Sequence, residues 1–448
     1  MSSTTTEHHA EPHSSQLEND ARLVTTSHSK VAPGEIAIGV IIGRASEYFD
    51  FFVFGIACVL VFPTVFFPFE ERLEGTLYSF VIFSFAFVAR PIGTALFMAI
   101  QRRWGRSAKL TAALFLLGTA TCGMAFLPGY ASLGSASIIL LALFRVLQGV
   151  AFGGSWDGLP SLLALNAPAN RRGWYSMLGQ LGAPIGFMIA SALFLYLYAE
   201  LSLGDFLDFG WRYPFFVAFA INVVALFARL RLVLTQEYTQ LMEEGELEPV
   251  PVTELVQAQG YNLFIGAFAA LASYALFHLV TVFPLSWIAL RSSQSITDVL
   301  FVQVIGAFVG IGATIASGLI ADRIGRRTTL GILAVLIGIF AVFAPWLIDG
   351  SPLAQDAFIL IGFALLGVSY GQSSGTVTAN FLPRFRYTGA ALTSDFAWLI
   401  GAAFAPVVAL GLSANYGLAY LSAYLLSGAA CTLLALRINK NFEARDWS

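Results

Sequence analysis

The 448-residue sequence is poor in charge, and none of its charge is gathered into a long basic block. Only 11% of the residues are Asp, Glu, Lys or Arg, which is far below the share found in ordinary soluble domains. The net charge is -3, so the charge balance gives no reason to expect a nucleic-acid partner. A soluble globular fold is therefore a poor interpretation of this chain.

Cysteine is also scarce. The three cysteines, Cys58, Cys122 and Cys431, stand in apolar runs without CxxC spacing, so neither a disulfide framework nor a metal site is expected. HExxH and phosphate-loop motifs are missing as well, so we expect no cofactor. Residues 1–34 lack the short apolar core of a cleavable signal and are rich in Ser, Thr, His and Glu, which predicts a disordered tail. Histidines in this tail could bind metal, but a solvated tail is the simpler interpretation.

Apolar residues, in contrast, are abundant. They make up 57% of the chain, and the mean hydropathy is +0.75, which indicates a protein that crosses a membrane many times. A bilayer core of about 30 Å needs about 20 residues of helix. We expect about twelve such helices. The candidate runs are 36–66, 75–100, 109–128, 135–165, 173–199, 212–234, 261–289, 298–320, 328–348, 355–382, 388–411 and 416–437.

The distribution of cations predicts the orientation. Loops after the even-numbered runs are rich in Lys and Arg, as in 102–109 and 323–327, and such loops tend to stay in the cytoplasm. Both termini are therefore expected in the cytoplasm. The acidic stretch between the sixth and seventh runs divides the chain into two halves. The predicted organisation is a tail at 1–34, a six-helix bundle at 35–235, a cytoplasmic linker at 236–260, a second six-helix bundle at 261–437 and a tail at 438–448.

The two halves resemble each other. "MAIQRRWGRS" at 98–107 and "GLIADRIGRR" at 318–327 occupy the same loop of each half, and "NRRGWYS" at 170–176 matches "RFRYTGA" at 384–390. Their offsets of about 215 to 220 residues are those of a duplicated six-helix unit.

Several motifs support a family resemblance. "GLIADRIGRR" has the Gly, Asp, Arg, Gly, Arg pattern of the major facilitator superfamily loop, and "EYFDFFVFG" at 47–55, "ARPIG" at 89–93 and "FRVLQGVAFGG" at 144–154 narrow the match. The chain resembles the metabolite:proton symporters, whose members carry citrate, 2-oxoglutarate, shikimate, or proline and betaine. The resemblance implies an all-α fold of two pseudo-symmetric six-helix bundles in the plasma (inner) membrane, working as a monomer by alternating access. Substitutions at Arg102, Ser155, Asp157, Ser394 and Asp395 depart from the family pattern and leave substrate and coupling open.

Charged residues inside the predicted helices are candidate functional groups, because a charge at a helix centre costs about 2.5 to 3.5 kcal/mol. Arg44, Glu47 and Asp50 fall within an arc of about 120° on the first helix. Arg44 and Glu47 can form a structural ion pair, which leaves Asp50 to meet a cation on another helix or to bind a proton. Burial raises the pKa of a carboxyl group and a nearby Arg lowers it, so Asp50, with Glu47 beside it, is the predicted proton-coupling group.

The predicted substrate site centres on Arg145, whose planar guanidinium matches a carboxylate. A structural partnership with a first-helix acid is the alternative for this residue. The resemblance implies that the first, fourth, seventh and tenth helices line the central cavity, and polar stripes fall on these helices. His278 is equally interpretable as a packing residue. The predicted substrate-binding set is Arg145, Gln148, Tyr274, His278, Gln372, Thr376 and Asn380.

Predicted gating groups lie toward the cytoplasmic ends. Arg90 and Asp395 are expected to pair across the two bundles in one state and separate in the other. Asp322, with Arg323 and Arg326, is placed to meet the positive end of a neighbouring helix, although a cation cluster that only fixes topology is the alternative. Asp157 is expected as a gate or a packing contact.

These features predict a secondary transporter that moves a small organic acid together with a proton across the lipid bilayer. A zwitterionic solute and a proton-independent facilitator or exchanger are the alternatives, followed by a channel or sensor. "GQSSG" at 371–375 fits the GxSxG motif of hydrolases, but it lies in a spanning helix rather than a strand-to-helix turn. We therefore do not expect an enzyme.

Overall fold

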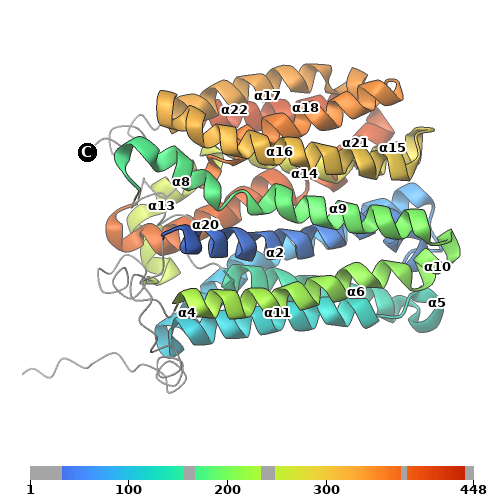
Figure 1. The fold of residues 1–448 in the computed structure, drawn as a ribbon, viewed down its shortest axis with the longest axis horizontal. Helices are drawn as coiled ribbons and strands as arrows, with labels where there is room; N and C mark the ends of the chain where they lie inside the picture. The colour runs from blue at the N-terminus through green and yellow to red at the C-terminus, as the bar shows by residue number, and fades with distance from the viewer. Residues whose placement is uncertain (1–32, 156–166, 234–247, 375–380, 439–448) are drawn as a thin grey trace, which may run out of the picture.

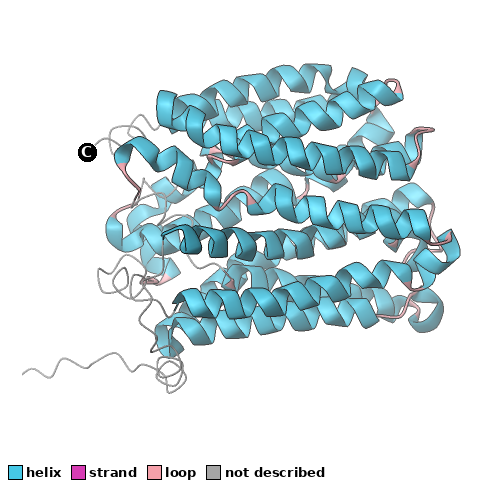
Figure 2. Cartoon of the chain, in the orientation of Figure 1, coloured by secondary structure: helices cyan, strands magenta, loops and turns pink. Residues whose placement is uncertain are grey.

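The computed structural model describes residues 33–155, 167–233, 248–374 and 381–438. Within these ranges the chain is helical and contains no β-strand (Figure 2). The long helices lie side by side along one axis (Figure 1). Helices of the first half fill most of the lower part of that view and helices of the second half the upper part, and the start of α2 lies at the same end as the C-terminus.

The first half of the chain ends with α11 at Val233. Its elements are α2 (Pro33–Leu60), α3 (Phe62–Val65), α4 (Arg72–Phe126), α5 (Tyr130–Leu133), α6 (Ser135–Gly154), η1 (Ala169–Arg171), α8 (Arg172–Leu178), α9 (Gly182–Glu200), α10 (Leu203–Asp208), η2 (Gly210–Arg212) and α11 (Tyr213–Val233).

The second half repeats this pattern with more breaks. Its elements are α13 (Val252–Ala269), α14 (Leu271–Thr281), α15 (Phe283–Arg291), α16 (Ile296–Ile324), α17 (Arg326–Ile348), α18 (Pro352–Tyr370), η3 (Pro383–Phe385), α20 (Arg386–Trp398), the π-helical turn η4 (Leu399–Ala403), α21 (Ala405–Tyr416) and α22 (Ala419–Ile438).

Ten helical stretches of the described residues are long and apolar enough to cross a membrane. One of them, α4, is interrupted at Gly105, where φ is 82° and ψ is 175°, so this stretch supplies two crossings. A side chain is strained at that φ, which explains the glycine at the turn. Helix α2 adds another crossing, because its 28 residues are long enough in spite of their charges. The described helices thus provide the twelve crossings expected from the sequence.

The surface and the interior of the protein are both suited to a bilayer. Large apolar side chains point outward, and Phe115, Trp346 and Phe308 are 73%, 68% and 61% exposed. Polar side chains such as Asp50 and Arg145 are instead fully buried inside the protein. This arrangement is the one that lipid favours, because hydrocarbon can solvate apolar groups but not charges.

Helices α4 and α6 approach each other very closely at two glycines of α6. A Cβ added at Gly149 would lie 2.3 Å from the carbonyl oxygen of Ala86, and one added at Gly153 would lie 2.3 Å from the amide nitrogen of Thr94. Such distances are far inside van der Waals contact, so only glycine fits at these positions. The second and fourth crossings therefore touch backbone to backbone.

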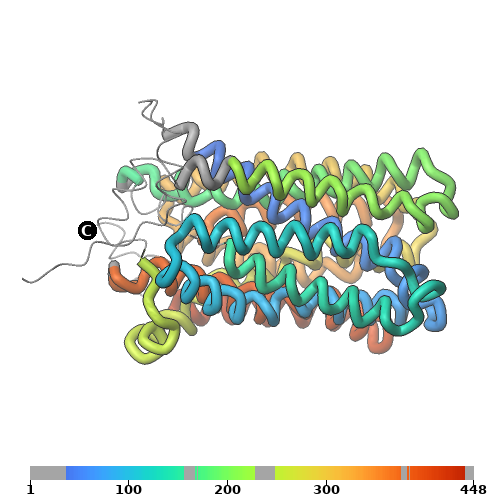
Figure 3. The backbone as a smooth tube through the Cα atoms, turned by 90° about the horizontal axis from the view of Figure 1, so that it is seen from below, coloured from blue at the N-terminus to red at the C-terminus, as the bar shows by residue number. Residues whose placement is uncertain are grey.

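Helix α13 begins within the segment predicted as a linker and bends at Gln259. The amide of Val250, just before it, donates to Thr388 Oγ1 at 3.0 Å, and Glu254 forms a 2.8 Å ion pair with Arg384. These contacts attach the start of α13 to η3 and α20, at the end of the bundle that also carries the C-terminus (Figure 3). Residues 236–247 of the predicted linker lie outside the described part of the chain.

Candidate functional site

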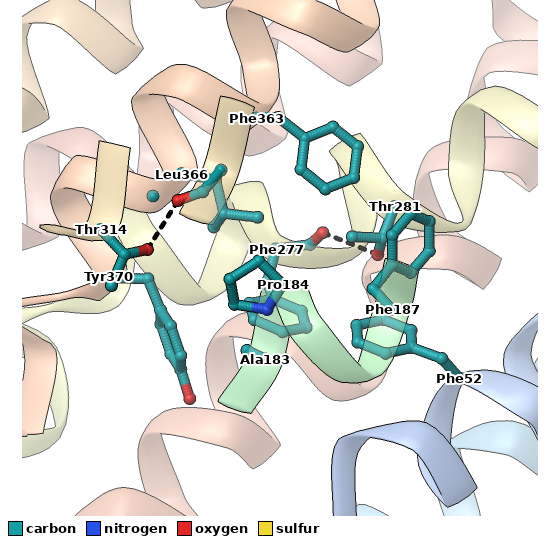
Figure 4. Close-up of a pocket in the computed structure, with 12 residues that line it drawn as sticks. Phe52, Ala183, Pro184, Phe187, Phe277, Thr281, Thr314, Phe363, Leu366 and Tyr370 are labelled. Atoms are coloured by element: carbon teal, nitrogen blue, oxygen red, sulfur yellow. Dashed lines mark hydrogen bonds between the residues drawn. The ribbon is translucent and has the colours of Figure 1, made fainter. Parts of the chain in front are cut away.

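Two cavities lie next to α2, between the two halves of the protein. We call the first the charged cavity; it holds about 410 Å³ of space between atoms, including its open side. Its lining residues are Arg44, Glu47, Tyr48, Phe51, Ala86, Phe87, Arg90, Phe152 and Trp398. We call the second the apolar cavity; it holds about 300 Å³ in the same sense (Figure 4). Its lining residues are Phe52, Ala183, Pro184, Phe187, Phe277, Thr281, Gly310, Thr314, Phe363, Leu366, Gly367 and Tyr370.

Ion pairs define the charged cavity. Arg44 Nη1 lies 2.8 Å from Glu47 Oε2 within α2, which is the intrahelical pair considered from the sequence. Arg90 Nε of α4 lies 2.7 Å from Asp395 Oδ1 of α20, so this pair joins the two halves as expected. Thr94 Oγ1 donates to the other oxygen of Asp395 at 2.5 Å. The gating role of Arg90 and Asp395 stays a prediction.

The other walls of the charged cavity are aromatic. The rings of Phe87 and Trp398 are stacked at 5.7 Å, and Phe51 lies 6.2 Å from Trp398. Tyr274, a predicted substrate residue, packs edge-on against Trp398 at 5.1 Å but does not line this cavity. The cavity therefore combines two guanidinium groups, each paired with a carboxylate, with flat apolar surfaces, so it offers both charged and apolar contacts to a ligand.

Asp50 turns away from both cavities into the first half. It is fully buried and accepts hydrogen bonds from Thr121 Oγ1 at 2.7 Å, Asn222 Nδ2 at 2.7 Å and Gln148 Nε2 at 2.8 Å. Asn222 in turn accepts from Ser46 Oγ at 2.9 Å. Within the described ranges no cation forms an ion pair with Asp50, so its charge is balanced by neutral donors.

Arg145 lies beside this network rather than on a cavity wall. Its Nε donates to the carbonyl oxygen of Phe83 at 3.2 Å and its Nη1 to Gln148 Oε1 at 3.0 Å. The guanidinium also lies 4.2 Å from the ring of Phe54. Gln148 thus connects Arg145 to Asp50, and neither Arg145 nor Gln148 lines the charged or the apolar cavity. Their predicted contact with substrate stays a prediction.

His278 is enclosed by aromatic rings. It is fully buried, and the centroids of Phe83 and Phe51 lie 5.1 Å and 5.3 Å from its own. Neither ring nitrogen has a hydrogen-bond partner among the described residues. Phe51 also lies 5.1 Å from the Arg145 guanidinium, so its ring lies between Arg145 and the charged cavity. His278 contacts this cavity's wall through three rings, Phe51, Phe87 and Trp398.

The motif loop makes the helix contact expected from its sequence. Asp322 accepts hydrogen bonds from the amides of Gly173 and Trp174, at the start of α8, at 2.7 and 3.2 Å. Gln372 joins the same region, donating to the carbonyl oxygen of Gly173 at 3.2 Å. Arg323 is exposed and Arg326 is buried. Gln372 therefore lies at the end of the interface, away from the cavities.

Three predicted site residues, Asp157, Thr376 and Asn380, lie outside the described residues. The sequence analysis in turn missed Thr121 and Asn222, which hold Asp50. An isolated Asn in the apolar run 212–234 was a signal for the second of these. The hydroxyl groups of Tyr48 and Tyr370, which hydrogen-bond to each other across the two halves, were also missed. Among the described residues no group of three His, Cys, Asp or Glu side chains could hold a metal ion.

Comparison with known proteins agrees with this architecture. The family model described as Major Facilitator Superfamily matches residues 42–406. The chain is 36% identical to the inner membrane metabolite transport protein YhjE of Escherichia coli over 90% of this chain and 93% of the other. It is 28% identical to the citrate-proton symporter of Klebsiella pneumoniae, over 90% and 91% of the two chains.

The same fold is found in a solved structure. The xylose transporter XylE from E. coli, in a partially occluded inward open conformation, superposes with a TM-score of 0.67 over 90% of this chain and 97% of XylE, at 17% identity. The chain is therefore a multi-pass membrane protein and a secondary transporter, and it belongs to the Major Facilitator Superfamily, within its metabolite:proton symporter family.

Proposed function

We propose that this transporter carries a small organic acid together with a proton, and that Asp50 is the group that binds the proton. The observation that supports this most directly is the environment of Asp50, a fully buried carboxyl group held by three neutral donors. Among the described residues no cation pairs with this carboxyl group directly, and Arg145 reaches it only through Gln148, so the group can gain and lose a proton as its surroundings change.

The charged cavity supports an anionic substrate. Arg90 pairs with an acid of the other half, so a substrate carboxylate that replaces Asp395 on Arg90 would release one contact between the halves. Arg44 lies in the same cavity beside Glu47 and offers a second guanidinium. An arginine presents several donors in a plane and suits a carboxylate. The symport of an anion with a proton also keeps the net charge of the transported pair low.

Contacts between the halves support alternating access. At the end that carries the C-terminus, Asp322 holds the start of α8. At the other end, a Cβ added at Gly55 would meet Val282 at 3.2 Å and one at Gly411 would meet Leu77 at 3.4 Å. If the contacts at one end open while the contacts at the other end stay closed, the cavities are exposed to one side of the membrane at a time. The predicted cytoplasmic position of both termini belongs to this proposal and places Asp322 on the inner side.

The test uses purified protein in proteoliposomes. We expect an organic acid added outside to make the external solution more alkaline, because protons enter with it. Asp50→Asn should abolish this pH change and retain counterflow exchange of labelled substrate. Glu200→Gln, at an exposed acid on the end of α9, is the matched control and should behave as the unchanged protein.

Each outcome decides between functions. If the external solution becomes as alkaline with Asp50→Asn as with the unchanged protein, Asp50 is not the proton site. Counterflow without any pH change in the unchanged protein would indicate a facilitator or exchanger. Uptake of betaine or proline, with no uptake of organic acids, would reject the organic-acid substrate in favour of a zwitterionic one.

A further inference from the structure

Aromatic residues of both halves lie between the two cavities. Phe52 of α2 stacks on Phe277 of α14 with 5.7 Å between centroids and 8° between planes. Beside them the hydroxyl groups of Tyr48 and Tyr370 hydrogen-bond to each other. Tyr48 lines the charged cavity, and Tyr370 lines the apolar cavity. Because each contact joins residues of opposite halves, any movement that parts the halves here makes the two cavities continuous.

The apolar cavity has little to offer a polar ligand. Its threonine hydroxyls are already used inside their own helices, since Thr281 Oγ1 donates to the carbonyl oxygen of Phe277 at 2.9 Å and Thr314 Oγ1 donates to that of Gly310 at 2.8 Å. Figure 4 shows the remaining space bordered by the rings of Phe187, Phe363 and Phe277 and by Leu366. A ligand hydroxyl entering this space would lose its hydrogen bonds to water without replacement.

The charges around the charged cavity limit the number of carboxylates that a substrate can carry. Two arginines, Arg44 and Arg90, are each matched by one acid, Glu47 and Asp395, so these four side chains carry no net charge. A monoanion can replace one acid on one arginine and leave one excess negative charge, which a single proton on a carboxyl group balances. A dianion or trianion would leave excess negative charge in a closed, low-dielectric space.

We propose that the substrate is an amphipathic monocarboxylate with an unhydroxylated ring or chain. Its carboxylate binds in the charged cavity, on Arg90 or Arg44, and its apolar body enters the apolar cavity beside Phe187 and Leu366. This inference rests on the proposed organic-acid symport and narrows the substrate from organic acids in general to this class. Polyhydroxylated ring acids and tricarboxylates are disfavoured by the same geometry.

The experiment measures binding, because hydrophobic acids also cross bilayers unaided. Dissociation constants for the purified protein are determined by thermal stabilisation with cyclohexanecarboxylate, phenylacetate, shikimate and citrate. Shikimate has a ring of the same size as cyclohexanecarboxylate but carries three hydroxyl groups. We expect the two hydrophobic monocarboxylates to bind at least roughly tenfold more tightly than shikimate or citrate.

Variants of the apolar cavity locate the ligand. Leu366→Asn should lower the affinity for cyclohexanecarboxylate by roughly tenfold, while the matched Leu366→Met should keep this affinity within about twofold. Phe187→Ser, on another wall of the apolar cavity, should weaken the binding of cyclohexanecarboxylate by a similar factor, and it replaces Leu366→Asn if that variant does not fold.

Absence of binding by both hydrophobic acids would overturn the inference whatever the other ligands do. Tighter binding of shikimate or citrate, with substrate-driven proton uptake intact, would overturn it too but would leave the proposed organic-acid symport standing. Unchanged affinity for cyclohexanecarboxylate in Leu366→Asn and in Phe187→Ser would contradict the placement of its ring in the apolar cavity.

Discussion

Neutralising Arg90 should open the end of the transporter at which it pairs with Asp395. In Arg90→Gln the carboxylate of Asp395 stays 2% exposed in the closed arrangement but has lost its cation. When the halves part, water can solvate that carboxylate. The substitution therefore destabilises the closed arrangement much more than the open one.

The size of the effect follows from the burial of the pair. Removing one partner of a buried ion pair costs about 3 to 5 kcal/mol. Arg90 borders a cavity, with 14% of its side chain exposed, and Thr94 still donates to Asp395, so the lower end of this range applies. About 3 kcal/mol corresponds to a change of roughly a hundredfold in the ratio of closed to open protein.

Distances between spin labels report this ratio. Labels at Arg103→Cys and Thr328→Cys, exposed positions of the first and second halves, are measured by double electron–electron resonance after Cys58, Cys122 and Cys431 are replaced. We expect the longer distance to become the major population in Arg90→Gln. The double variant Arg90→Gln with Asp395→Asn should return toward the original distribution, because neither residue is then charged.

The control is the exposed ion pair of Glu254 and Arg384, whose side chains are 38% and 69% exposed. Arg384→Gln should shift the distribution by less than about 1 kcal/mol, since surface pairs contribute little. An unchanged distribution in Arg90→Gln would refute the reasoning. Strictly additive losses of transport in the single and double variants would also count against a gating pair.

Three further outcomes are expected. Phe51→Ala removes the ring between the charged cavity and Arg145, so proteoliposomes should leak protons without substrate under an imposed membrane potential, whereas Phe51→Leu should stay tight. Gly173→Ala places a Cβ 2.8 Å from that of Ala321, so the halves should part there and the closed population fall by roughly tenfold or more in the same spin-label measurement. Asn222→Ala removes a donor to the carboxylate of Asp50, so the pH of half-maximal proton uptake should rise by roughly one unit; an unchanged pH profile would contradict the role of this network.

Much of the fold is predictable from the sequence because lipid imposes strong rules on composition and length. Each crossing needs a long apolar run, and such runs are visible without a structure. The segment around Gly105 shows the limit of this reasoning. The runs at 75–100 and 109–128 belong to two helices that meet at a sharp turn at Gly105, and the polar residues near that turn concealed how far each helix extends.

The site was less predictable, because the direction of a side chain depends on the neighbouring helices. Residues on one predicted face of α2 divide in the structure: Arg44 and Glu47 border a cavity, whereas Asp50 faces α4, α6 and α11. Helical spacing gives an angle but does not say which partner lies at that angle. Pairs that join distant segments, such as Tyr48 with Tyr370, have no signal in a single sequence.

The glycine contacts between α4 and α6 have a mechanical consequence. Because the two backbones touch at Gly149 and Gly153, these crossings have little room to slide or tilt independently, so we expect them to move as one rigid unit. In this rigid unit, α4 carries Arg90, which forms an ion pair with Asp395 of the opposite half. Helix α6 carries Gln148, which donates a hydrogen bond to Asp50. A movement that separates Arg90 from Asp395 would therefore also displace Gln148, which hydrogen-bonds to Asp50. The predicted gating pair and the proposed proton site are thus attached to the same rigid unit, and no long chain of residues is needed to couple them.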